Sequence, residues 1–67
     1  MDLSENIAKN INAKRKELSI DRLSILSNVP SSTLWKIVRK ESRDVKISTL
    51  YAIATALKCT VDDLLKG

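Results

Sequence analysis

SIDRLSILSNVPSSTLWKIVRK, residues 19–40, contains two short helical patterns joined by a polar turn. In the first pattern Leu23 and Ser27 lie four residues apart, and in the second Leu34, Ile37 and Val38 recur at i, i+3 and i+4. These spacings predict helices over 20–27 and 31–39, each with one buried side. The opposite side of the second helix is polar and basic.

The turn between these helices contains Asn28, Val29 and Pro30. Asn suits a left-handed residue after a helix, Val29 can turn back into the core, and Pro30 fits where a helix starts. Two helices joined by so short a turn form a helix-turn-helix, whose second helix can lie in the major groove of DNA.

Length and composition limit the class of protein. The 67 residues predict one domain, 1–67, with no room for an enzyme-sized cleft. The chain has no His and a single cysteine, Cys59, which is expected to be a small core residue. This composition excludes the usual zinc sites and an internal disulfide, so no metal or cofactor is expected. The sequence shows no nucleophile–base pair and no glycine-rich phosphate loop, which argues against an enzyme and against a small-molecule substrate.

Charge and hydropathy indicate the kind of partner. Twelve Lys and Arg against eight Asp and Glu give a net charge of +4, which suits a polyanion, although many ordinary domains carry such a charge. No apolar run approaches the ~20 residues of a membrane span, and Asp2 to Asn6 is not a basic leader. A cytoplasmic location without a membrane partner is therefore expected.

Three further helices complete an all-α, compact five-helix bundle. Asp2 and Glu5 form a capping-box pattern before a helix from about Leu3 to Glu17. Ser19 is the expected N-cap of the helix over 20–27, Ser48 that of a helix over 48–57, and Thr60 that of a last helix through Lys66. The predicted core consists of Ile7, Ile11, Leu18, Leu23, Val29, Leu34, Ile37, Leu50, Ile53 and Leu57. Ile25 falls opposite the buried side of its helix, so it should face solvent or a partner.

The order LS..RLS..SNV..STLWKI, followed after a loop by STLYAIATALKCTVDDLL, resembles the lambda-repressor-like (Cro/repressor, XRE-type) helix-turn-helix family over nearly the whole chain. The positions that carry the resemblance are Leu18-Ser19, Asn28-Val29-Pro30, Ser32-Thr33-Leu34 and Leu57-Lys58-Cys59-Thr60. The resemblance implies a regulator of transcription, with repression the expected mode, that binds double-stranded operator DNA, commonly as a symmetric dimer.

The chain departs from the family pattern at four places. Ile20 stands where the family often has a phosphate-binding Gln, so that contact is expected to be lost or moved to Arg22. Asn28, Lys40 and Lys58 stand where glycine is usual. A non-glycine residue in the left-handed conformation costs roughly 1 kcal/mol or more, and a reshaped turn is the alternative to that cost.

The helix over 31–39 is expected to read DNA bases. The predicted base-reading residues are Ser31, Ser32, Lys36, Thr33 and Trp35. Hydroxyl groups can donate or accept, and Lys36 suits the O6 and N7 acceptors of guanine. Thr33 has a structural role as its alternative. Trp35 either packs on a thymine methyl or a sugar, or is partly buried on the neighbouring loop.

Polar and basic residues around that helix are expected to bind phosphates, with an ordinary solvated surface as the alternative. They are Ser19, Arg22, Arg39, Lys40, Arg43 and Lys46. A twofold homodimer is predicted to join through the last helix, with Leu65 as the main contact and Val61 beside it.

The competing interpretation is an antitoxin or a protein-interaction adaptor of the same fold. Ile25, Leu26 and the apolar last helix favour it, whereas the basic residues around the helix over 31–39 favour DNA. The two functions can coexist, since an antitoxin can repress its own promoter.

Overall fold

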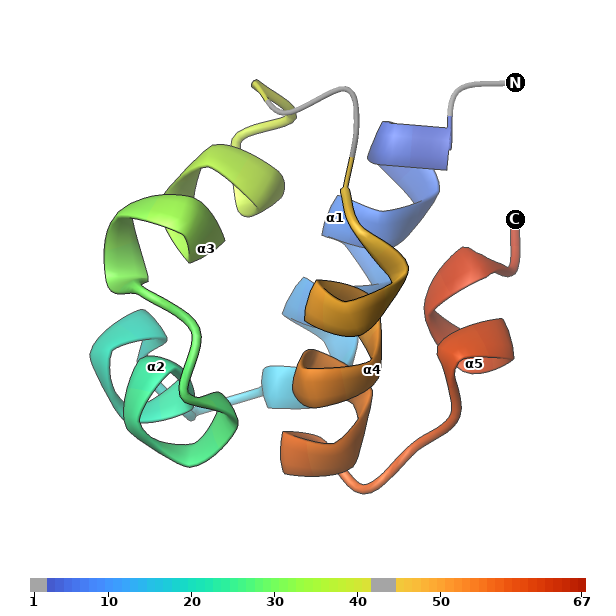
Figure 1. The fold of residues 1–67 in the computed structure, drawn as a ribbon. Helices are drawn as coiled ribbons and strands as arrows, with labels where there is room; N and C mark the ends of the chain where they lie inside the picture. The colour runs from blue at the N-terminus through green and yellow to red at the C-terminus, as the bar shows by residue number, and fades with distance from the viewer. Residues whose placement is uncertain (1–2, 42–44) are drawn as a thin grey trace.

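Five helices form in residues 3–41 and 45–67, the part of the chain that the computed structural model describes (Figure 1). They are α1 (Leu3–Arg15), α2 (Ile20–Ser27), α3 (Ser31–Val38), α4 (Ile47–Ala56) and α5 (Val61–Leu65). The predicted all-helical, compact five-helix fold is confirmed. None of these helices, within the described ranges, is both long and apolar enough to cross a bilayer.

The core is shared by all five helices. Helix α1 packs against α3 and α5, α4 packs against α2 and α5, and α2 packs against α3. Figure 1 shows α2 and α3 on one side of the bundle and α5 on the other. The largest fully buried side chains are Ile11, Leu23, Leu34, Ile37, Ile53 and Leu64, so each helix contributes at least one. Removing any helix would therefore expose part of the common core.

The core differs from the predicted set at its edges. Leu18 and Leu57 are only partly buried, because Leu18 lies between α1 and α2 and Leu57 caps the end of α4. Four apolar residues outside the predicted set are also buried, Ala8, Ile20, Ala54 and Leu64, as are the polar Ser4 and Ser27. Leu3, the first residue of α1, is 57% exposed.

Several helix limits also differ from the prediction. Helix α1 ends at Arg15 rather than Glu17, because Lys16 turns to a φ of 49° and the Arg15 guanidinium donates to the Leu18 carbonyl at 2.9 Å. Helix α4 begins at Ile47, so the prediction of Ser48 as its N-cap is wrong. The cap is Lys46, whose carbonyl already accepts from the Leu50 amide at 3.0 Å.

Helices α3 and α5 each end one residue earlier than predicted, at Val38 and Leu65, since Arg39 and Lys66 are their C-caps. The Ser19 and Thr60 caps are confirmed. The predicted cap residue Asp2 lies outside the described residues.

The turns at Lys40 and Lys58 are not reshaped, although glycine is missing. Their φ values are 63° and 59°, which is the left-handed conformation. After α3 the amides of Lys40 and Glu41 donate to Ile37 and Lys36 at 3.1 and 2.8 Å, and after α4 those of Lys58 and Cys59 donate to Thr55 and Ala54 at 3.1 and 2.9 Å. Both ends are Schellman motifs, whose hydrogen bonds satisfy the last carbonyls of each helix and offset the conformational cost.

Helix α5 has five residues, too few to be stable alone, and is held at both ends. At its start Thr60 and Asp63 form a capping box, and the Thr60 amide together with the Lys66 ammonium lowers the pKa of Asp63 to about 2. At its end the Asn10 side-chain amide donates to the carbonyls of Leu64 and Lys66 at 2.9 and 2.7 Å. Asn10 thus ties α1 to the C-terminal helix.

The left-handed lysines give a prediction about stability. Lys58→Gly should raise the free energy of unfolding by about 0.5–1 kcal/mol, because glycine removes the Cβ penalty while the greater freedom of the unfolded chain returns part of it. Lys14→Gly, in the last turn of α1, should instead lower the free energy of unfolding by about 1 kcal/mol. Urea titration of the three proteins provides the measurement, and a destabilised Lys58→Gly variant would contradict the strain at this turn.

Candidate nucleic-acid interface

The angle between α2 and α3 is fixed by two serines and one buried valine. Asn28 takes the left-handed conformation, with φ 59° and ψ 28°, as predicted. The Ser27 hydroxyl donates to the Leu23 carbonyl at 2.7 Å and accepts from the Val29 amide at 3.3 Å. The Ser24 hydroxyl donates to the Val29 carbonyl at 2.6 Å. Both backbone polar groups of buried Val29 therefore have partners within α2.

Sequence reasoning missed the role of Ser24. The one sequence signal for this role is that Ser24 lies five residues before Val29, which turns into the core. Serine occurs at such positions for many other reasons, so the signal is weak. Ser27 is identified by its helical spacing, and its bond to the Leu23 carbonyl lies within α2. Its bond from the Val29 amide depends on the conformation of Asn28 and does not follow from that spacing.

Helix α3 is anchored by one side and presents the other. Leu34 and Ile37 are buried, whereas Ser32, Trp35 and Lys36 are exposed. The predicted division of this helix into a core side and a polar side is confirmed. Pro30 occupies the N-cap position and provides no side-chain hydrogen bond, but its carbonyl accepts from the amides of Thr33 and Leu34 at 3.0 and 3.1 Å.

Ser31 and Thr33 are less accessible than the rest of the predicted base-reading set. Both are partly buried. Thr33 lines a shallow hollow of about 330 Å³ between the turn at Asn28 and the start of α4, together with Ser48. This position supports the structural alternative for Thr33, although part of its side chain remains open to solvent.

Trp35 and Arg39 form a stacked pair on the surface. Trp35 is 41% exposed, and the Arg39 guanidinium carbon lies 4.9 Å from the centroid of its ring. The two residues are four positions apart, so they occupy neighbouring turns at the end of α3. The neighbour that covers the ring is thus a cation of the same helix end.

Four of the predicted phosphate-binding cations lie among the described residues. Arg22, Arg39, Lys40 and Lys46 are exposed. Within residues 3–41 and 45–67 the ion pair present joins Lys66 to Asp63 at 3.2 Å, so none of these four cations is matched by a described carboxylate. Arg43 lies outside the described residues. Exposed cations that lack an ion-pair partner among the described residues raise the local potential and attract an anion.

The start of α2 is the place where the family often has a phosphate-binding Gln. Ile20 is 3% exposed and belongs to the core, so its side chain cannot reach a ligand. Ser19 accepts the Arg22 amide at 3.1 Å as the N-cap, which leaves its hydroxyl hydrogen available. Arg22 is the exposed cation in the first turn of the same helix.

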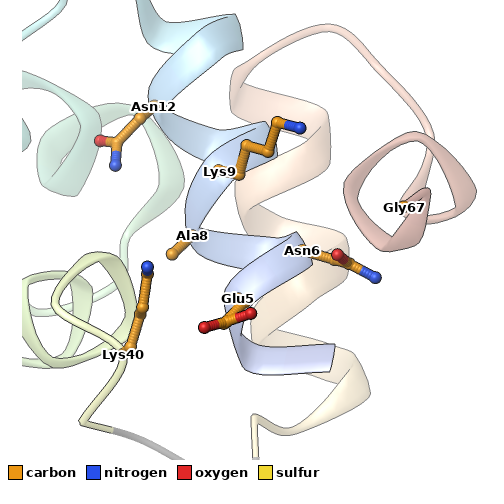
Figure 2. Close-up of a pocket in the computed structure, with 7 residues that line it drawn as sticks. All are labelled: Glu5, Asn6, Ala8, Lys9, Asn12, Lys40 and Gly67. Atoms are coloured by element: carbon orange, nitrogen blue, oxygen red, sulfur yellow. The ribbon is translucent and has the colours of Figure 1, made fainter. Parts of the chain in front are cut away.

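Lys40 lies beside α1 rather than on the outward side of α3. It lines a hollow of about 490 Å³ together with Glu5, Ala8 and Lys9. Figure 2 shows the Lys40 side chain directed along α1 toward Ala8, with the Glu5 carboxylate nearby. The hollow combines two ammonium groups with one carboxylate, an arrangement that favours no particular ligand.

An apolar hollow lies away from the polar side of α3. Its volume is about 290 Å³, and its lining includes Leu3, Val45, Ile47 and Leu65. Ile47 is 69% exposed, and sequence reasoning did not single it out. Leu65, predicted to contact a second copy, lines this hollow. Val61, predicted beside it, is partly buried and packs against the core.

The structure also gives the exposure of the apolar residues of α2 and the position of the single cysteine. Ile25 is 71% exposed, as expected, and Leu26 is 51% exposed. Cys59 is partly buried against the core, where desolvation raises the pKa of its thiol. A raised pKa keeps the thiol neutral and unreactive.

Comparison with known proteins points to one family. The sequence model of the Cro/C1-type HTH DNA-binding domain matches residues 9–66. An uncharacterized HTH-type transcriptional regulator of Rickettsia prowazekii is 31% identical over 71 residues, covering 98% of this chain and 77% of the relative. One of Rickettsia conorii, also 31% identical, is covered over 65% of its length, and so this chain spans less than two thirds of that protein. No solved structure matches the chain significantly.

Proposed function

Because this chain belongs to the Cro/C1-type helix-turn-helix DNA-binding family of transcriptional regulators, a non-enzymatic family, we propose that it is a cytoplasmic repressor that reads operator DNA through α3 in the major groove. One observation carries the proposal: α3 fills the core with Leu34 and Ile37 while its opposite side is polar, basic and open. A helix held in this way can enter a groove without losing its packing.

Base reading is assigned to the exposed polar side of α3. Lys36 can donate to guanine O6 and N7, and the hydroxyls of Ser31 and Ser32 can donate to or accept from either base type. The exposed positions of Ser32 and Lys36 support this role most strongly. Thr33 and Trp35 have weaker support as base readers, the first because it is partly buried and the second because the Arg39 cation lies over its ring.

Phosphate binding is assigned to the groups on both sides of α3. Ser19 and Arg22 lie at the start of α2, and Arg39, Lys40 and Lys46 follow α3 along the chain. Arg43 is proposed from its place in the sequence alone. Such contacts fix the register of the protein on the duplex without reading its sequence.

The proposed unit on DNA is a twofold dimer. Helix α3 has eight residues and spans roughly 12 Å, so one copy reaches only a few base pairs. Two copies would double the contacts in successive major grooves about 34–36 Å apart. The apolar hollow at Leu3, Ile47 and Leu65 supports a contact between copies. Each copy measures 30 × 22 × 21 Å, which is compatible with that spacing for touching copies.

A second function, an adaptor or antitoxin with a protein partner, is favoured by one observation. Ile25 and Leu26 are adjacent exposed apolar residues on α2. The two functions can coexist, since an antitoxin can repress its own promoter. Arg22, Arg39 and Lys46 are exposed and form no ion pair among the described residues, which makes DNA the stronger candidate.

The function is tested by selecting bound duplexes from random DNA with the wild-type chain, followed by two variants. Lys36→Ala and Ser32→Ala should each reduce discrimination between the selected and a scrambled site by about 1–3 kcal/mol, because base contacts carry specificity. Their unfolding curves should be unchanged. Recovery of no common site, or wild-type discrimination by both variants, would contradict reading by α3.

The phosphate role is tested at Lys46, at the N-terminal end of α4. Lys46→Ala should weaken binding to every duplex and lower the slope of log K against log salt by about 0.9, the value for one released counterion. Lys58→Gly removes the same charge at the opposite end of α4 and serves as the control. Equal slopes for wild type and Lys46→Ala would show that Lys46 does not bind phosphate and is an ordinary solvated surface residue.

The dimer is tested by the number of chains per duplex in sedimentation. Wild type should place two chains on a palindromic selected site, and both Ile47→Glu and Leu65→Glu should leave one, because a carboxylate cannot be buried in an apolar contact. Ile47 is mostly exposed, so its variant should fold even if Leu65→Glu does not. Ile25→Glu changes an equally exposed apolar residue elsewhere and should still give two. A wild-type complex with one chain would refute the dimer.

A further inference from the structure

We infer that Trp35 is a positioning residue for Arg39, and that its indole ring holds the guanidinium in the orientation in which it binds a DNA phosphate. The inference rests on the proposed function and assigns Trp35 a different task from base reading. It starts from the 4.9 Å between the guanidinium carbon and the ring centroid.

The backbone at this point is already fixed. Arg39 is the C-cap of α3, and its amide donates to the Trp35 carbonyl at 3.0 Å. Only the side-chain torsions of Arg39 remain to be ordered, and an arginine side chain carries considerable rotamer entropy. Stacking on a ring four residues earlier restricts those torsions before DNA arrives.

The stacked arrangement leaves the binding groups free. A guanidinium stacked on an aromatic ring uses its flat face, whereas its N–H donors point outward in the plane. In the described part of the chain Arg39 has no carboxylate partner, and the ion pair present lies at Asp63 and Lys66. The contact thus leaves the donor fork of Arg39 without a carboxylate among the described residues, and such a fork can bind the two oxygens of a phosphate.

Arg22 provides the comparison. It is also exposed, lies on α2 near the same surface, and lacks an aromatic neighbour among the described residues. The same type of cation therefore occurs with and without a supporting ring. Preorganisation should distinguish their contributions to binding.

The experiment is a double-mutant cycle on affinity for the selected duplex at one salt concentration. Trp35→Leu should weaken binding about two- to fivefold, the range for a solvent-exposed cation–π contact. The same change should have little effect in an Arg39→Ala background, and Trp35→Phe should retain most of the affinity that Trp35→Leu loses. If the fold-loss in affinity of the double variant equals the product of the two single fold-losses, Trp35 contributes independently of Arg39, and the inference is overturned.

The free protein gives a second measurement, because Trp35 is the only tryptophan. Arg39→Ala should shift the tryptophan emission without DNA, whereas Arg22→Ala should not. An unchanged emission in Arg39→Ala would also overturn the inference. If wild type binds no duplex while the emission shift is present, the proposed function fails although the stacked pair exists, so the two failures are distinguishable.

Discussion

The reversal of the chain at Val29 is the constraint on which the rest of the structure depends. Val29 must be buried to close the core between α2 and α3, and burial requires partners for its amide and its carbonyl. The hydroxyls of Ser27 and Ser24 supply both partners from the preceding helix. Together with the left-handed Asn28, they determine the direction in which α3 leaves the turn, and hence which of its residues face solvent.

The sequence predicted the fold best where local chemistry sets a limit. Helix α2 was predicted to the residue because Ser19 caps one end and Asn28 terminates the other. Helix α4 was placed one residue late: Ser48 has the chemistry of a cap, but Val45 packs against the core and brings the extended residue to Lys46. Such a shift depends on tertiary packing, which periodicity does not contain.

In the candidate site, too, spacing predicts some features, whereas others depend on tertiary packing. The open side of α3 follows from the spacing of Leu34 and Ile37, which defines the buried side. Spacing also places Trp35 and Arg39 on neighbouring turns, but it does not decide between stacking and separate solvation. The apolar hollow joins Leu3, Ile47 and Leu65 from three helices, and only their packing brings these residues together.

The bonds from Asn10 to the carbonyls of Leu64 and Lys66 have a consequence for the order of folding. They join residues 54 and 56 positions apart, so the chain between them must be brought together before they can form. The entropy of closing so long a loop favours earlier formation of the local α2–α3 contacts. Helix α5 should then dock late and open first, as the least protected unit of the native state. A contact between copies at Leu65 would suppress the local unfolding of α5, so assembly would be coupled to the completion of folding.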